Sequence, residues 1–322
     1  MQPLFSFRQL SERRSELMGL SILWIMMLHF TFTQMKPLGF VSQYGFAGVE
    51  IFVFLSGFGL YRSLEKSPGI LRFYHRRLLR IFPTYYLVGI AASLLLFHDN
   101  LLTYIFRYST LGFWTGGPYW EWYVPSIVAL YLLAPLLKRV VDANRYAVAV
   151  LSAVVLLSAW CLIDNESLLP RSHFFFLYRI PAFLLGLTCG YWHLHNTSLR
   201  YFWGILVAGL PLFCLLYPYH HEVYNYKYFS VLFLLPLFIV VLTQLSDRLP
   251  WLSSLTRHMG VASFEIYLIQ GLFFSSILEG LLVVPSAWHD LFSILFIITS
   301  TLLGLAVHKF IDHFIIHRLF SR

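Results

Sequence analysis

The sequence predicts an all-α membrane protein, a polytopic bundle of about ten transmembrane helices with both termini in the cytoplasm. Three observations support this fold class. Of the 322 residues, 58% are hydrophobic and only 12% are charged, whereas soluble domains average about 25% charged residues. Apolar segments long enough to cross a bilayer recur along the chain, and Lys and Arg gather on alternate sides of them. This composition excludes two soluble domains, a disordered chain and a disulfide-rich framework.

The apolar segments define the elements in chain order. A helix needs about 20 apolar residues to cross a bilayer, and ten segments meet that length. The segment 101–117 is apolar but interrupted by Arg107 and glycines, so we expect an interfacial or re-entrant piece there. No repeat or linker divides the chain, which predicts one domain over 1–322 with a cytoplasmic segment at 1–16 and a cytoplasmic tail at 311–322. No cleavage site follows the first apolar run, so we expect an uncleaved span. The predicted spans are 17–34, 45–63, 78–97, 122–141, 145–163, 174–193, 201–218, 227–245, 261–284 and 289–310.

Basic residues set the predicted orientation. With the N-terminus in the cytoplasm, 18 of the 23 Lys and Arg residues lie in inner segments and five lie on the outer side. This alternation holds through all ten spans and supports an even number of them. The net charge of +8 therefore indicates a membrane-side asymmetry rather than a nucleic-acid partner. The three cysteines lie in apolar stretches without metal-ligand spacing, so we expect no metal.

His29 is the first candidate functional residue, because ionisable groups inside a span are costly. It is the only ionisable residue between Leu17 and Phe32. At ~1.5 Å per residue it lies about 18 Å along the helix from Leu17, in the outer half of the membrane. A histidine can serve as a general base because its pKa lies near working pH. The alternative is a structural histidine bonded to a neighbouring helix.

Two carboxylates at outer span ends, Glu50 and Glu121, are the candidate partners of His29. A carboxylate on one imidazole nitrogen fixes the tautomer and stabilises the imidazolium, so both are catalytic candidates. A solvated acid at a vestibule mouth is the alternative for each. Ser56 lies further along the second span, next to glycines that permit close approach by a helix or ligand. We expect Ser56 to contact the acyl donor.

Arg76, Arg77 and Arg80 form the candidate cofactor-binding cluster. Their spacings of three and four residues put them on one side of a helix at the cytoplasmic mouth. Guanidinium groups there can bind phosphates bidentately, although a plain positive-inside anchor would look the same in sequence. Arg179 lies just inside the sixth span, where it can pair with an outer carboxylate or bind an anionic acceptor.

These segments together resemble the acyltransferase-3 family, integral-membrane acyltransferases that modify bacterial surface sugars. Residues Glu16–Phe30, which include His29, resemble its first span. Gly48–Phe58 resembles its second-span motif, and Phe73–Pro83 resembles its arginine-rich motif before the third span. The matches follow in order over roughly 12–272. The later matching segments are Trp122–Val124, Leu130–Pro135, Arg179–Gly186 and Ser263–Gln270.

The resemblance implies transfer of an acyl group, usually acetyl from acetyl-CoA, to a sugar hydroxyl. It implies that His29 is the catalytic histidine and that Arg77 and Arg80, with Arg76 adjacent, hold the coenzyme. The implied partners are an acyl-CoA donor, a glycan or lipid-linked sugar acceptor and membrane lipids, in a bacterial cytoplasmic (inner) membrane. Without a following esterase-like domain, the chain resembles the short stand-alone form.

The chain departs from the family pattern at two positions. Met18 stands eleven positions before His29, where many members carry Arg or Lys. A basic role there is therefore either absent or supplied elsewhere, for example by Arg13 or Arg14. Gln270 stands where many members carry a histidine.

The sequence therefore predicts a membrane O-acetyltransferase with a histidine general base, acting by direct transfer or through an acetyl-histidine. Tyr119 and Trp120 belong to an aromatic outer loop that can stack on sugar rings or form an interfacial belt. Three alternatives stay open. They are the same fold using succinyl-CoA or another acyl-CoA, a transporter of a glycan or small anion, and a catalytically silent scaffold.

Overall fold

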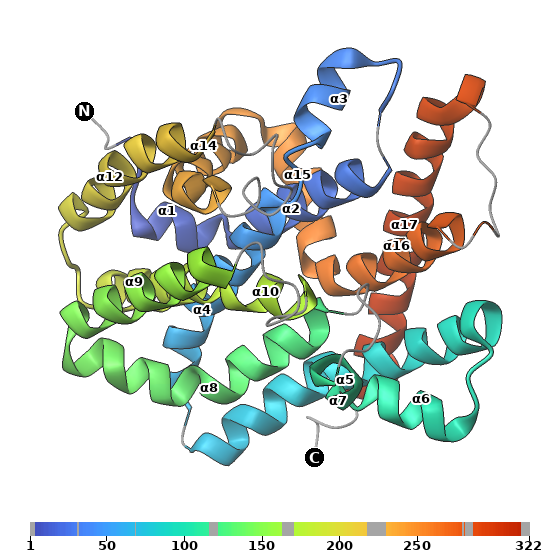
Figure 1. The fold of residues 1–322 in the computed structure, drawn as a ribbon, viewed down its shortest axis with the longest axis horizontal. Coiled ribbons are helices and arrows are strands. Elements are labelled where there is room, and N and C mark those ends of the chain that lie inside the picture. Colours follow the sequence, from blue (N-terminus) through green and yellow to red (C-terminus); the bar gives the residue numbers. More distant parts are fainter. Residues whose placement is uncertain are drawn as a thin grey trace.

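The computed structural model describes residues 4–30, 32–67, 69–115, 122–162, 171–217, 230–278, 280 and 286–316. Most of these residues are helical, and none of them forms a strand. The prediction of an all-α protein is therefore confirmed (Figure 1). The α-helices are α1 (Phe7–Glu12), α2 (Arg14–His29), α3 (Lys36–Ser42), α4 (Ala47–Glu65), α5 (Ile70–Ala92), α6 (Leu101–Tyr108), α7 (Leu111–Trp114), α8 (Tyr123–Ala143), α9 (Arg145–Leu162), α10 (Arg171–Leu177), α11 (Ile180–Leu194), α12 (Arg200–Leu216), α14 (Leu235–Arg248), α15 (Pro250–Val261), α16 (Ser263–Leu278) and α17 (His289–Ile311). Short π and 3-10 segments are η1 (Ser93–Phe97), η4 (Leu232–Leu234), η5 (Ser286–Trp288) and η6 (Asp312–Ile316).

Several of these helices are suited to a membrane. In the described part of the chain, five are long and apolar enough to cross it, and a sixth candidate is a bent pair. Each of the ten predicted spans overlaps a helix. The apolar segments of α2, α9, α12 and α16 are, however, too short to count as candidate membrane-crossing helices. The structure thus supports a helical membrane protein, while ten crossings and two cytoplasmic termini stay predictions. The five helices are Ala47–Glu65, Ile70–Phe97, Tyr123–Ala143, His173–Leu194 and His289–Phe314.

Helix α4 lies at the centre of the bundle and α17 at one edge (Figure 1). In the apolar window of α4, 78% of residues are buried, against 17% for α17. Helix α11 contacts α4 closely because glycines remove side chains between them. A Cβ at Gly186 would lie 2.1 Å from the Phe54 carbonyl oxygen, and one at Gly57 would lie 2.3 Å from the Phe183 oxygen. Small residues at this interface therefore let the backbones of the two helices approach closely, as they do in other membrane helix pairs.

A sharp corner joins α14 to α15. Leu249 has φ −119° and ψ 81°, a non-helical conformation typical of a residue before proline. Pro250 then begins α15, where its missing N–H is not needed. The two helices differ by 118° in direction. As a result α15 lies against the first half of α2, so close that a Cβ at Gly19 would collide with the Thr256 carbonyl oxygen at 1.8 Å.

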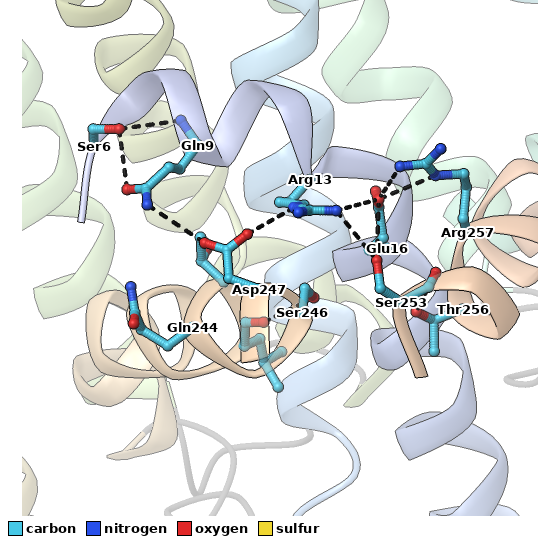
Figure 2. Close-up of polar contacts among 12 residues, drawn as sticks. Ser6, Gln9, Arg13, Glu16, Gln244, Ser246, Asp247, Ser253, Thr256 and Arg257 are labelled. Atoms are coloured by element: carbon cyan, nitrogen blue, oxygen red, sulfur yellow. Dashed lines mark hydrogen bonds and ion pairs between the residues drawn. The ribbon is translucent and has the colours of Figure 1, made fainter. Parts of the chain in front are cut away.

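A polar network fastens this corner to the start of α2 (Figure 2). The Arg13 Nε donates to Asp247 Oδ1 across 2.8 Å, and Arg257 Nη2 donates to Glu16 Oε1 across 2.7 Å. Burial alone would raise the pKa of Glu16, which precedes the first predicted span, but hydrogen bonds and charges of Arg257 and Arg13 outweigh it. They hold the pKa of Glu16 below its ordinary value. The network therefore contains a carboxylate that stays ionised at neutral pH.

Candidate active site

A cavity of about 230 Å³ lies between α2, α4, α5, α8, α15 and α16. Its walls combine apolar groups with hydroxyls and guanidiniums, and these polar groups come from helices far apart in sequence. Arg14 and Met18 line it from α2, Ser56 from α4, and Tyr123 from α8. An internal space with a few convergent polar groups is the usual form of a small-molecule site.

The predicted arginine cluster divides between the cavity and the surface. Helix α5 continues through Pro83, so the three arginines do lie on one helix. Arg77 and Arg80 line the cavity. Arg76 instead donates from Nη2 to the Ser67 hydroxyl across 3.0 Å and is not part of the lining. The structure therefore brings two of the three arginines to one site.

Arg80 is held at the cavity wall by contacts with two other helices. Its Nη2 donates to the Val261 carbonyl oxygen across 3.0 Å and lies 3.9 Å from Glu265 Oε1. The Glu265 side chain is fully buried on α16, and the same oxygen lies 3.3 Å from His308 Nδ1 on α17. Thr84 Oγ1 lies 3.5 Å from that oxygen. Glu265 thus helps to hold Arg80 in place at the cavity.

Hydroxyl groups form the middle of the cavity wall. Ser56, which we expected to contact the acyl donor, lines the cavity together with the partly buried Tyr123. Tyr131 lines it two turns further along α8. Sequence did not single out Tyr123, because an aromatic residue near a span end suggests an interfacial belt first. It gave Tyr131, in the middle of the same span, no role. Their place in the wall follows from helix packing.

His29 is the last residue of α2 and is held by α16. Its Nδ1 lies 2.6 Å from Gln270 Oε1, and its ring stacks on Phe274 with centroids 4.5 Å apart. With an amide oxygen as acceptor, Nδ1 carries the proton and Nε2 keeps a lone pair. That tautomer can accept a proton at Nε2. A structural histidine would make the same contact, so activity measurements must separate the two roles.

The cavity extends along α2 toward His29. Arg14 lines one end and Ile25 lines the other. These residues are eleven positions apart, which is about 16 Å at 1.5 Å per residue. Ile25 lies one turn before His29, and Tyr267, also in the lining, lies one turn before Gln270 on α16. The guanidiniums therefore line the cavity itself, whereas His29 is not part of the lining and follows Ile25 by one helical turn.

The carboxylate expected beside His29 has a different partner. Glu50 lies in the first turn of α4, and its Oε1 is 3.4 Å from the Arg179 Nε, with both side chains almost fully buried. The Arg179 guanidinium also stacks on Trp122 at 4.3 Å. A buried carboxylate is stabilised more by a permanent cation than by a neutral imidazole. Glu50 therefore pairs with Arg179 rather than with His29. Arg179 thus contacts an outer carboxylate, whereas its binding of an anionic acceptor stays a prediction.

Three predicted site residues, Glu121, Tyr119 and Trp120, lie outside the described residues. Among those that are described, no group of three or more His, Cys, Asp and Glu side chains could hold a metal ion.

Comparisons with known proteins agree on the kind of protein. A curated protein of Acidianus two-tailed virus, named "Putative acetyltransferase ORF330", is 26% identical over 317 residues, which cover 92% of this chain and 87% of that protein. No solved structure matches this chain. The family described as "Acyltransferase domain" matches residues 17–308, a segment that holds His29 and the arginines of α5. The chain therefore belongs to the acyltransferase-3 family, whose common activity is acyl transfer.

Proposed function

We propose that this protein is a membrane O-acetyltransferase. It moves an acetyl group from cytoplasmic acetyl-CoA to a hydroxyl of a cell-surface or lipid-linked glycan, with His29 as the general base. The observation that carries the proposal is a single cavity that runs from Arg77 and Arg80 to within one turn of His29. An acyl-CoA has a matching layout, with phosphates at one end, a long uncharged arm, and a reactive carbonyl at the other end.

The donor enters from the arginine end. Arg80 is 37% exposed, so this end is the mouth of the cavity. The volume of about 230 Å³ accommodates the narrow pantetheine arm rather than the whole coenzyme. The nucleotide therefore stays at the mouth, where Arg77 and Arg80 bind its phosphates. Acetyl-CoA is a substrate here, and the reaction needs no resident cofactor or metal.

The chemistry proceeds at Nε2 of His29. The acceptor hydroxyl gives its proton to Nε2 while its oxygen attacks the thioester carbonyl carbon. The carbon–sulfur bond then breaks, and the imidazolium returns the proton to the CoA sulfur. Gln270 keeps Nδ1 protonated throughout, and Ser56 and Tyr123 offer O–H donors along the passage to the carbonyl. Glu50 acts through its ion pair with Arg179, which fixes the first turn of α4.

The acceptor reaches His29 from the opposite, outer side in a bacterial cytoplasmic membrane. The aromatic segment that includes Tyr119 and Trp120 supplies faces on which sugar rings stack. Glu121, the residue after Trp120, is the carboxylate nearest to this segment in the sequence. Because donor and acceptor enter from opposite ends, the thioester and the hydroxyl meet only beside the imidazole.

The test uses purified protein in nanodiscs. Acetyl-CoA binding and release of free CoA in the presence of a lipid-linked oligosaccharide are measured for wild type, His29→Ala and Arg77→Ala/Arg80→Ala. Arg76→Ala is the matched control, because Arg76 lies on the same helix but outside the cavity. We expect the double arginine variant to lose binding and His29→Ala to bind without turnover. Arg76→Ala should bind acetyl-CoA and release free CoA as wild type does.

Other outcomes assign other functions. If wild type binds no acyl-CoA and instead moves an oligosaccharide or small anion across a liposome membrane, the chain is a transporter. If succinyl-CoA is used in place of acetyl-CoA, the fold and site stand and the donor changes. Full turnover by His29→Ala would exclude the histidine base. An acetyl adduct on His29 after one turnover without acceptor would establish the two-step route.

A further inference from the structure

Arg13 and Arg14 are adjacent at the start of α2, with Arg13 just before the helix and Arg14 as its first residue, but their side chains have different partners. Arg13 lies in the network of Figure 2, where it donates to Asp247 and lies 3.3 Å from Glu16 Oε1. Arg14 points into the cavity described above and is part of its lining. One arginine is therefore neutralised by acids, and the other is available to a ligand.

The Arg14 side chain fits a place that α4 leaves open for it. Its Nε donates to the Leu55 carbonyl oxygen across 3.2 Å. A Cβ at Gly59 would lie only 3.0 Å from three atoms of the Arg14 guanidinium. The absence of a side chain at Gly59 thus lets the guanidinium lie flat against α4. A single carbonyl holds one of its nitrogens and leaves the rest of the planar group for other acceptors.

The cavity carries more positive charge than its acids balance. None of the ion pairs among the described residues includes Arg14 or Arg77. The Nε of Arg77 is buried and lacks a hydrogen-bond partner in the structure. Arg80 has one acid near it, Glu265 at 3.9 Å, which His308 also contacts. Buried cations without acids are costly unless an anion joins them, so the site is incomplete without an anionic ligand.

We propose that Arg14 completes, with Arg77 and Arg80, a three-arginine site that binds a diphosphate group across α2 and α5. The inference rests on the proposed function and deepens it, because it names a donor-binding residue outside the arginine run of α5. It also lies outside the segment 17–308 that the family match covers. A diphosphate carries two adjacent charged groups, and guanidiniums from two helices can bind both at once.

Met18 supplies a test of position within the same helix. It lies one turn after Arg14 on the same face of α2 and also lines the cavity. A guanidinium placed at position 18 would enter the cavity one turn nearer to His29. The swap Arg14→Met/Met18→Arg therefore keeps the composition of the helix and moves only the charge.

The experiment measures equilibrium binding in nanodiscs for wild type, Arg14→Met, Arg13→Met and the swap. The probes are acetyl-CoA, dephospho-CoA, pantetheine and farnesyl diphosphate. Dephospho-CoA keeps the diphosphate and lacks only the 3′-phosphate, whereas pantetheine lacks every phosphate. We expect Arg14→Met to weaken acetyl-CoA and dephospho-CoA about tenfold to a hundredfold, which is the value of a charge-assisted hydrogen bond. Pantetheine affinity should not change, and the swap should recover part of the loss.

Arg13→Met is the matched control. It removes a neighbouring guanidinium and two ion pairs, so the melting temperature should fall while acetyl-CoA affinity stays at the wild-type value. Equal losses for pantetheine and acetyl-CoA in Arg14→Met would overturn the proposal, because they would indicate damage to the cavity rather than a lost phosphate contact. Unchanged acetyl-CoA and farnesyl diphosphate binding in Arg14→Met would overturn it as well.

Farnesyl diphosphate, a lipid diphosphate, distinguishes two possible ligands that carry the same diphosphate group, an acyl-CoA and a lipid-linked acceptor. If Arg14→Met weakens farnesyl diphosphate and spares acetyl-CoA, the three-arginine site stands and belongs to a lipid-linked acceptor. If wild type binds acetyl-CoA, and Arg14→Met binds acetyl-CoA and farnesyl diphosphate as well as wild type does, the proposed function stands without this inference. If wild type binds none of the four probes, both fail.

Discussion

The imidazole of His29 and the side-chain amide of Gln270 are joined by a contact of 2.6 Å between Nδ1 and Oε1. The two residues are 241 positions apart, and the contact ties the end of α2 to the middle of α16. It replaces the carboxylate–histidine pair that the sequence led us to expect. An amide fixes the tautomer as a carboxylate does, but it adds no negative charge beside a developing imidazolium.

Gln270→Leu should lower kcat about fivefold, since it removes a hydrogen bond of about 1 kcal/mol that selects the active tautomer. KM for acetyl-CoA should change little, because the arginine end of the cavity is untouched. Gln270→Glu keeps an acceptor on Nδ1 and should retain most of the turnover. Steady-state kinetics of both variants measures the difference. Equal losses for Leu and Glu would show that size, and not hydrogen bonding, matters at this position.

Glu50→Ala should destabilise the protein by about 3–5 kcal/mol, because it leaves the buried Arg179 without its carboxylate. Arg179→Met should have a similar effect. The double variant Glu50→Leu/Arg179→Met should be less destabilised than the sum of the single variants, since neither charge remains. Thermal unfolding in detergent gives the coupling between them. If the effects simply add, the two side chains do not act as a pair.

Gly186→Ala should destabilise the contact between α4 and α11 by about 1–3 kcal/mol, the usual cost of an added methyl in a filled interface. The Cβ would meet the Phe54 carbonyl oxygen at 2.1 Å, and backbone cannot rotate away as a side chain can. Gly204→Ala on α12 is the matched control, because nothing lies within 4 Å of its added Cβ. Alanine should stabilise that helix by about 0.5–1 kcal/mol. Similar melting temperatures for the two variants would contradict the interface.

The ion pairs of Glu16 should make the stability of the folded protein depend on pH. Its pKa is lowered in the folded protein, so its contribution is present above the unfolded value of about 4.3 and is lost as the pH falls through the folded value. Wild type should therefore melt at a higher temperature than Glu16→Gln at neutral pH, and the difference should shrink below pH ~4. Glu12→Gln is the control, since Glu12 is 58% exposed and pairs only with Arg8 on the surface. A constant difference across the pH range would exclude the ion pairs of Glu16 as its cause.

Local pattern predicted the helices well, because apolar runs of membrane length leave few other structures. The same reasoning placed Arg77 and Arg80 on one side of a helix, since their spacing alone decides this. It did not find the 118° corner, because α15, which begins at Pro250, carries polar residues and has no apolar run of its own. A proline predicts that a helix begins there, but not the direction in which it leaves.

Contacts between distant helices lay beyond local pattern. Glu50 and His29 were placed at similar depths, but depth does not state which faces meet, and Arg179 lies on the face that meets Glu50. Arg13 and Arg14 show the same limit at a smaller scale. Arg13 precedes α2 and contacts Asp247 of α14, whereas Arg14, the first residue of α2, lines the cavity. Only the packing of distant helices decides this difference.

Helix α2 carries Arg14 at its first residue and His29 at its last. Fifteen positions of rigid helix separate them, about 22 Å at 1.5 Å per residue. The length of α2 therefore sets the distance between Arg14, which binds the phosphates of the donor, and His29, which acts as the base. The pantetheine arm of the donor has to span that distance. Loops elsewhere can lengthen or shorten without altering that measure. A single residue inserted within α2 would shift the base by about 1.5 Å and turn it by about 100°, so this helix should tolerate substitutions far better than changes in its length.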